Sequence, residues 1–362
     1  MQSWVIVLDR PSVDPNSVVA GLSLALRLAL DAQAGGASAV VVDPADPVTE
    51  RALRDRRLKI PVLPDVPAST RSLRVPASFV VHRALFKTLA EKDAAAPQRD
   101  LRARPFSLGL AYAFDPIDVS DDRSRARAER ALFRSLRKPQ DGWTSRHINR
   151  HVSLALSRLL VKTPLSPNQL SVGILCVGLY GAYLAAQGSY QSMAIGAALF
   201  QAQSVLDGCD GELSRVTYRA SHLGEWLDTI GDDLTSYAFF VAAGFGLERA
   251  TGQGLYLVAG LVVLVAGLIA SGLEYRYLLR IGSGDLLAYP LSQGEGTGRL
   301  AFIQPLFKRD SFVLLTLVAS LLGFLGPMLC LFAAGAVGVL IAVVRTELRL
   351  ARARAPSTQG GV

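Results

Sequence analysis

The chain has 362 residues, half of them hydrophobic, and a formal net charge of +8. Its basic residues cluster beside hydrophobic segments and form no RNA- or DNA-binding signature, which argues against a nucleic-acid partner. The three cysteines lie in or beside apolar segments without metal-ligand spacing, which argues against a zinc site or a disulfide framework. The first residues lack a basic region followed by an apolar stretch, so we expect no cleaved signal peptide and a cytoplasmic first domain.

Residues 1–138 have the pattern of a cytoplasmic α/β domain, because short apolar runs alternate with helical segments. The alternation predicts a mainly parallel sheet. A strongly charged helix ends the domain. The expected strands are 4–8, 60–63 and 78–82, with a turn into a further buried strand over 35–43, and the expected helices are 21–33, 83–93 and 122–138.

Residues 139–167 are predicted to form an interfacial amphipathic helix and a linker. Five apolar side chains can share one helical face, with arginines and a lysine elsewhere: Trp143, Ile148, Val152, Leu156 and Leu159. This pattern is typical of a helix lying in the lipid headgroup region. An ordinary surface helix packed on the first domain is the alternative, and the adjacent hydrophobic span favours the interfacial position.

The fold class predicted for the whole chain is an α-helical membrane protein with six transmembrane helices, preceded by a cytoplasmic α/β domain. A span needs about 20 apolar residues. The membrane domain covers 168–350, and 351–362 read as a flexible basic tail. The expected spans are 168–187, 190–210, 225–247, 254–278, 311–325 (extending towards Arg309) and 327–345. Lys and Arg concentrate in the segments that follow the second, fourth and sixth spans. By the positive-inside rule, this distribution places both termini in the cytoplasm.

Four aspartates lie near the predicted cytoplasmic ends of the second and third spans. Asp207 and Asp210 share one helical face, and Asp228 and Asp232 share a face of the next helix. Antiparallel packing would bring four carboxylates together, where they repel each other unless a cation offsets them. Oxygen ligands without His or Cys select Mg²⁺, Mn²⁺ or Ca²⁺ over zinc. Such a metal suits diphosphate chemistry.

These residues form a longer pattern that resembles the signature of the CDP-alcohol phosphotransferase family, D-x2-D-G-x2-A-R-x8-G-x3-D-x3-D. In this chain the pattern reads Asp207-x2-Asp210-Gly211-x2-Ser214-Arg215-x8-Gly224-x3-Asp228-x3-Asp232. Every spacing matches, and Ser214 in place of Ala is the single departure. The six-span layout also agrees with this family.

The resemblance implies a CMP-forming transfer of a substituted phosphate from a CDP-linked donor to an alcohol, in a homodimer. Asp232 is then the base that deprotonates the acceptor hydroxyl. The remaining implied roles are Mg²⁺ or Mn²⁺ binding by Asp207, Asp210, Asp228 and Asp232, and nucleotide binding by Gly211, Ser214, Arg215 and Gly224. The spacing of Asp233 fits no position of the pattern. Asn168, beside Pro167, is expected to cap the first span, and a direct contact with the substrate is the alternative.

The acceptor is less defined by the sequence. Basic residues near the cytoplasmic openings would suit a phosphorylated acceptor such as an inositol phosphate or a glycerol phosphate. The candidates are Arg276, Arg280, Lys308 and Arg309. The alternative is that these residues are positive-inside anchors of the spans.

Two stretches of the first domain, "GLSLALRLALDAQAGGASAVVVD" and "FDPIDVSDDRSRARAERAL", resemble pieces of a nucleotidyltransferase-like domain. Such a domain precedes the membrane half in bifunctional inositol-phosphate cytidylyltransferase and di-myo-inositol phosphate phosphate synthases. Active domains of that kind have a glycine-rich phosphate loop after the first strand, whereas this chain has "VLDRPSVDPNS". We therefore expect this domain to be inactive and to serve a structural or regulatory role.

Two other functions are compatible with intramembrane carboxylates. An ion- or proton-coupled transporter would use them as a relay, but here they gather near one side of the bilayer. A non-catalytic membrane scaffold is the other alternative, and the intact set of aspartates argues against it.

Overall fold

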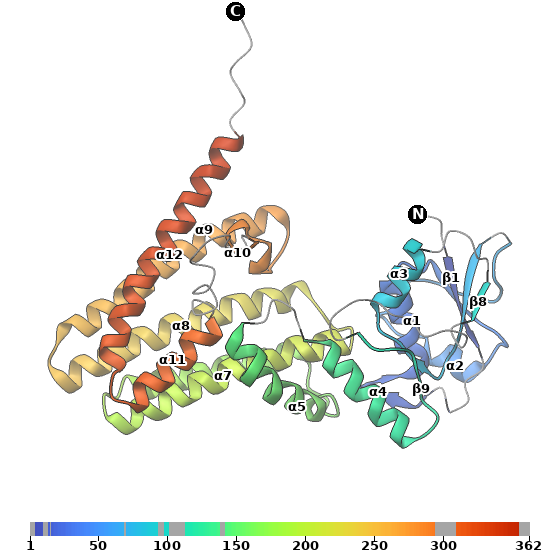
Figure 1. Cartoon of the computed structure of the whole chain (residues 1–362), viewed down its shortest axis with the longest axis horizontal. Coiled ribbons are helices and arrows are strands. Elements are labelled where there is room, and N and C mark those ends of the chain that lie inside the picture. The colour runs from blue at the N-terminus through green and yellow to red at the C-terminus, as the bar shows by residue number, and fades with distance from the viewer. Residues whose placement is uncertain are drawn as a thin grey trace, which may run out of the picture. The chain divides into compact units, whose positions relative to one another are not determined.

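The computed structural model describes residues 4–9, 14, 16–68, 70–92, 98–100, 113–137, 142–293 and 309–354 (Figure 1). The chain divides into two compact units. The α/β unit comprises Met1–Gln140, Leu154–Pro164 and Glu212–Arg219. The helical unit comprises Asp141–Ser153, Leu165–Gly211 and Ala220–Val362.

The α/β unit is built on a five-stranded sheet in the order β5-β4-β1-β6-β8. Each neighbouring pair is parallel. These strands are β1 (Trp4–Asp9), β4 (Ala39–Val42), β5 (Val62–Leu63), β6 (Arg71–Pro76) and β8 (Gln98–Asp100). The predicted parallel sheet is therefore confirmed.

Strands β1 and β4 are central because their side chains are apolar on both faces. Ile6 and Leu8 belong to one core cluster together with residues of α1 (Leu24–Ala34), whereas Val5 and Val7 belong to another. Continuous apolar runs of this kind are typical of buried parallel strands. The remaining helices of the unit are α2 (Pro47–Ala52), α3 (Ala84–Lys92) and α4 (Asp122–Ser135).

Two strand predictions differ from the structure. One neighbour of β1 is β6, "RSLRVP", which the sequence does not predict as a strand because it is charged and ends in proline. The predicted strand at 78–82 is instead the short β7 (Phe79–Val80), which pairs antiparallel with β9 (Ile117–Asp118) outside the main sheet. A small hairpin pairs β2 (Val18–Val19) with β3 (Leu22–Ser23).

The helical unit contains six helices that correspond to the six predicted spans. They are α6 (Pro167–Ala185), α7 (Tyr190–Val216), α8 (His222–Thr251), α9 (Gly254–Ile281), α11 (Arg309–Leu321) and α12 (Leu325–Arg354). Shorter helical segments are a π-helical turn (Ser145–Asn149), α5 (Arg150–Leu160), a 3₁₀ turn (Leu286–Ala288) and α10 (Pro290–Gln293). Both α5 and α7 continue into the α/β unit.

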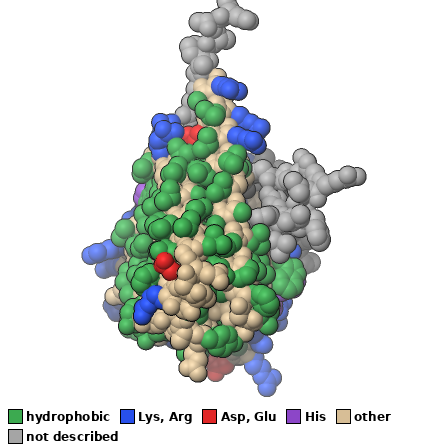
Figure 2. All heavy atoms as spheres, turned by 90° about the vertical axis from the view of Figure 1, so that its left-hand side faces the viewer, with side chains coloured by type: hydrophobic (Ala, Val, Ile, Leu, Met, Phe, Trp, Pro, Cys, Tyr) green, Lys and Arg blue, Asp and Glu red, His purple; other side chains and the backbone are tan. Residues whose placement is uncertain are grey.

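Within the described part of the chain, three helices are long and apolar enough to cross a membrane: α6, α9 and Leu325–Arg352 of α12. Of the other three predicted spans, α7 and α8 carry the aspartates, which lower their mean hydropathy, and α11 has 13 residues. Large hydrophobic side chains are exposed along α9 and α12, including Leu255, Val265 and Leu331. Figure 2 shows a face covered mostly by hydrophobic side chains, as expected of a lipid-facing surface.

Glycines bring α8 close to α9. A Cβ at Gly244 would lie 2.5 Å from the carbonyl oxygen of Tyr256, and a Cβ at Gly260 would lie 2.6 Å from that of Phe240. Small residues at helix contacts are the usual device for close packing in membrane proteins. This contact fixes α8, which carries the second group of aspartates.

Candidate metal and substrate site

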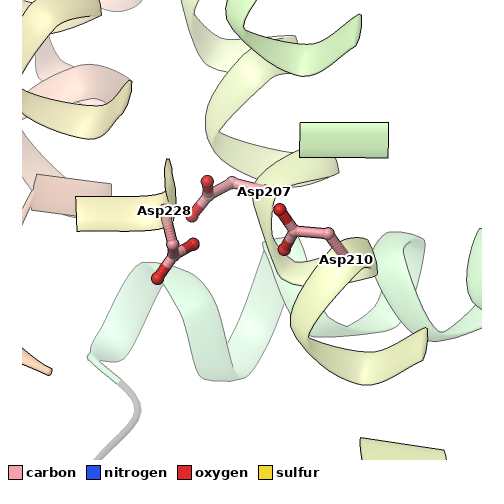
Figure 3. Close-up of side chains that lie close together, drawn as sticks. All are labelled: Asp207, Asp210 and Asp228. Atoms are coloured by element: carbon pink, nitrogen blue, oxygen red, sulfur yellow. The ribbon is translucent and has the colours of Figure 1, made fainter. Parts of the chain in front are cut away.

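Three of the predicted metal ligands lie together in the helical unit. One carboxylate oxygen from each of Asp207, Asp210 and Asp228 lies within 4.8 Å of the others. Asp207 and Asp210 come from α7 and Asp228 comes from α8, and their carboxylates point into a shared space (Figure 3). Asp210 is buried, Asp207 is half-buried and Asp228 is exposed, so the site is open on one side.

Local sequence explains how the two helices present these groups. Positions 207 and 210 are three apart, so both side chains leave the same face of α7. The hydroxyl of Ser171 on α6 donates to Asp210 Oδ2. Ser221 caps α8 by accepting a hydrogen bond from the Gly224 amide at 3.0 Å, which starts the helix two turns before Asp228. This serine cap was missed, although a serine directly before a helical segment is a recognised start signal.

The ligand chemistry of this group fits a divalent cation. Three carboxylates so close together repel one another, and bound positive charge relieves that repulsion. The site offers oxygen ligands only, as Mg²⁺, Mn²⁺ and Ca²⁺ prefer. The exposed side at Asp228 leaves room for water or phosphate oxygens to complete the coordination.

Asp232, the fourth predicted ligand, lies beside this group but pairs with an arginine. Arg309 Nη1 lies 2.9 Å from Asp232 Oδ1 and 3.9 Å from Asp207 Oδ2. The same guanidinium donates to Gln203 Oε1 at 2.7 Å. Arg309 therefore brings a fixed positive charge from α11 to the edge of the aspartate group.

Two glycines near the aspartates, Gly208 between Asp207 and Asp210 and Gly224 of the pattern, differ in their surroundings. A Cβ at Gly208 would lie 3.1 Å from Ser153 Oγ of α5, so this glycine serves helix packing. A Cβ at Gly224 would lie 3.1 Å from Asn168 Oδ1. The prediction that Asn168 caps α6 is wrong, because Ser166 is the cap and forms a capping box with Gln169. The Asn168 side chain lies against Gly224 instead.

The other predicted nucleotide-binding residues lie near the end of α7. Gly211 is half-buried and follows Asp210 on the helix. Ser214 and Arg215 lie in the last turn of α7, in the part of the helix that belongs to the α/β unit.

The predicted acceptor residues are not gathered in one place. Arg309 is beside the aspartates, as described above. Arg276 Nη2 pairs with Glu347 Oε2 of α12 at 2.8 Å, and Arg280 is exposed near the end of α9. Lys308 lies outside the described residues.

Asp233, which matched no position of the pattern, has a packing role. Its Oδ2 accepts hydrogen bonds from the hydroxyls of Ser271 and Tyr275 on α9, the latter at 2.6 Å. The Tyr237 and Ser271 hydroxyls are 2.7 Å apart. Asp233 thus joins α8 to α9, on a different face of α8 from Asp228.

Comparison with known proteins finds a family that the helical region resembles. Residues 165–344 match the CDP-alcohol phosphatidyltransferase family. The three aspartates, Gly211 and Gly224 all lie within the residues that match this family. Proteins of this family are membrane-embedded transferases, which agrees with the three apolar helices.

Named relatives resemble only part of this chain. "Bifunctional IPC transferase and DIPP synthase" of Aquifex aeolicus is 34% identical over 137 residues, covering 38% of this chain and 31% of the relative. The protein of the same name from Thermococcus kodakarensis is 32% identical over 161 residues, covering 44% and 35%. The chain therefore spans about a third of the length of these relatives. A solved structure of Mycobacterium tuberculosis phosphatidylinositol phosphate synthase with CDP-DAG bound matches 59% of this chain and 98% of that chain, at 17% identity and a TM-score of 0.43.

Proposed function

We propose that the protein is an integral membrane CDP-alcohol phosphotransferase that moves a substituted phosphate from a CDP-linked donor to an acceptor hydroxyl and releases CMP. The observation that carries this proposal is the group formed by Asp207, Asp210 and Asp228 within a domain of the matching family. The similarity to the bifunctional IPC transferase and DIPP synthases supports a phosphorylated polyol as acceptor, such as an inositol phosphate.

Asp207, Asp210 and Asp228 would hold Mg²⁺ or Mn²⁺, with Asp232 at the edge of the site. When bound, the cation would neutralise charge on the donor diphosphate and on the CMP leaving group. Asp232 would accept the proton of the acceptor hydroxyl as its oxygen attacks the phosphorus bound to the alcohol moiety. The bond between that phosphorus and the CMP oxygen breaks, and the new phosphodiester forms.

The other predicted site residues have supporting parts in this proposal. Gly211 and Gly224 let the nucleotide approach the backbone closely. Ser214 and Arg215 contact the nucleotide. Arg309 is the acceptor-phosphate candidate that lies beside the aspartates, where its guanidinium orients Asp232 and attracts an anionic acceptor.

We place six spans in the membrane, with both termini in the cytoplasm, because the six helices fall where the hydropathy pattern predicts them and the basic residues favour that side. Trp143, Ile148, Val152 and Leu159 are exposed on the segment around α5, which supports its position at the lipid headgroups. The family resemblance favours a homodimer. We assign no CDP-alcohol synthesis to the α/β domain.

The test is CMP release by the purified protein in lipid nanodiscs with Mg²⁺ or Mn²⁺. CDP-inositol, CDP-glycerol and CDP-diacylglycerol are each supplied with inositol phosphate or glycerol phosphate. Asp207→Asn removes a charged ligand, so we expect turnover to fall by about 100- to 1000-fold, as when a principal electrostatic group is removed. Asp285→Asn, on a loop outside the pattern, is the matched control. Wild-type-like CMP release by Asp207→Asn, or cation transport without CMP release, would refute the proposal.

A further inference from the structure

Helix α7 ends in an unusual backbone conformation. We call Glu212–Arg219 the link segment; it joins the aspartates of α7 to α8 and packs as part of the α/β unit. The Arg219 amide donates to the Ser214 carbonyl at 2.8 Å, and Tyr218 has a φ of 54°. This is a Schellman ending with tyrosine where glycine is usual. A side chain in that left-handed conformation is disfavoured, so its contacts must compensate.

Residues of the α/β unit supply those contacts. The Tyr218 hydroxyl donates to Asp31 Oδ1 of α1, and its ring packs on the cluster formed by Leu22, Leu26 and Leu30. Burial raises the pKa of Asp31 to about 6 and raises the pKa of Tyr218 as well. The hydroxyl is therefore bound inside the unit and not in solvent.

Two arginines bind the last carbonyls of the helix. Arg27 Nη2 lies 3.0 Å from each of the Val216, Val19 and Ala20 carbonyl oxygens, and the Arg27 side chain is fully buried. Arg57 Nη1 donates to the Thr217 carbonyl at 2.7 Å, and Asp55 holds the same guanidinium. The final carbonyls of a helix lack intrahelical partners and carry the negative end of the helix dipole. Cationic donors satisfy both needs.

We propose that Arg27, Asp31 and Arg57 are positioning residues for the phosphotransfer reaction. By holding the link segment they fix Ser214 and Arg215, and so set the affinity for the CDP-linked donor. The proposal rests on the function proposed above, because it assigns nucleotide contact to those two residues. It gives the α/β domain a function that needs no glycine-rich phosphate loop of its own.

A kinetic experiment separates positioning from general stability. Tyr218→Phe removes only the hydroxyl that donates a hydrogen bond to Asp31. Tyr180→Phe, at an exposed tyrosine of α6, is the matched control. We expect the KM for the CDP-linked donor to rise about tenfold, the usual cost of one hydrogen bond to a charged group, with kcat and the acceptor KM unchanged. Arg57→Gln should act in the same way. A lower kcat at unchanged donor KM would show a purely structural role and overturn the proposal.

Hydrogen exchange of the full-length protein tests the same contacts without activity. We expect Tyr218→Phe and Arg57→Gln to speed amide exchange in peptides covering the link segment, with β1 and α8 protected as in the wild type. Unchanged exchange in the link segment would refute the idea that Asp31 and Arg57 hold this segment in place. If exchange changes as expected but no donor yields CMP, the proposed phosphotransferase function fails, and with it the role of the link segment in donor binding. If CMP is released but the KM for the donor does not change in the variants, only the positioning proposal fails.

Discussion

Asp31 makes the stability of the α/β unit sensitive to pH. It is 3% exposed, and burial raises its pKa from 3.8 to about 6, although Arg27, Tyr218 and Arg83 lower it in part. Between these two pH values the unfolded chain has released a proton that the folded unit retains. Raising the pH therefore favours unfolding: the contribution of Asp31 to stability is fully present below about pH 4 and is lost as the pH passes 6.

The size of this effect follows from the two pKa values. A shift of about two units corresponds to about 3 kcal/mol at 1.36 kcal/mol per unit. The assay is hydrogen exchange of the β1 and β4 peptides in the full-length protein between pH 4.5 and 7.5, corrected for intrinsic rates. Asp31→Asn keeps an acceptor for Tyr218 but cannot titrate. Its protection relative to the wild type should therefore increase by about 2 kcal/mol over this range, because about 1 kcal/mol of the full effect is already present at pH 4.5. Parallel curves for the two proteins would refute the reasoning.

Two further predictions concern the helical unit. Arg309→Gln removes the charged contact with Asp232 and should lower kcat/KM by about 10- to 100-fold. Arg249→Gln, at the exposed end of α8, is the control and should leave kcat/KM unchanged. Equal kcat/KM values for the two variants would contradict the role assigned to Arg309. Gly260→Val should destabilise the contact of α9 with α8 by about 1–3 kcal/mol, because the new side chain meets the Phe240 carbonyl. Thermal unfolding in detergent measures this, with Gly272→Val, where a Cβ has open space, as the control; matching melting temperatures would show that this contact is not tight.

The sequence predicts the parallel sheet well because β1 and β4 are apolar at every position that faces the two layers of the unit. It fails at β6, where Arg71, Arg74 and the final Pro76 give a sequence unlike a buried strand. Sheet membership there depends on pairing with β1, over sixty residues away, and no local pattern reports such pairing. The helices of the helical unit are long and periodic, so their positions could be predicted closely.

The candidate site divides in the same way. The grouping of Asp207, Asp210 and Asp228 follows from helical spacing and antiparallel packing. The contact of Arg27 with the Val216 carbonyl does not, because it joins a side chain to a backbone oxygen 189 positions later. Every residue has a backbone carbonyl, so the amino-acid sequence does not show which carbonyl a side chain will contact. The contacts that hold the end of α7 could therefore be found only in the folded structure.

Helical periodicity also explains why neighbouring aspartates of α8 have different roles. Asp228 and Asp232 are four apart, so their side chains are separated by only about 40° around the helix and both face the α7 aspartates or Arg309. Asp233 is five positions from Asp228, a rotation of about 140°, and it faces α9, where Ser271 and Tyr275 donate to it. The hydroxyls of α9 satisfy a carboxylate that cannot reach the metal site. The carboxylates on the two faces of α8 are thus stabilised differently. Asp232 pairs with Arg309, whereas Asp233 accepts hydrogen bonds from neutral donors that join α8 to α9.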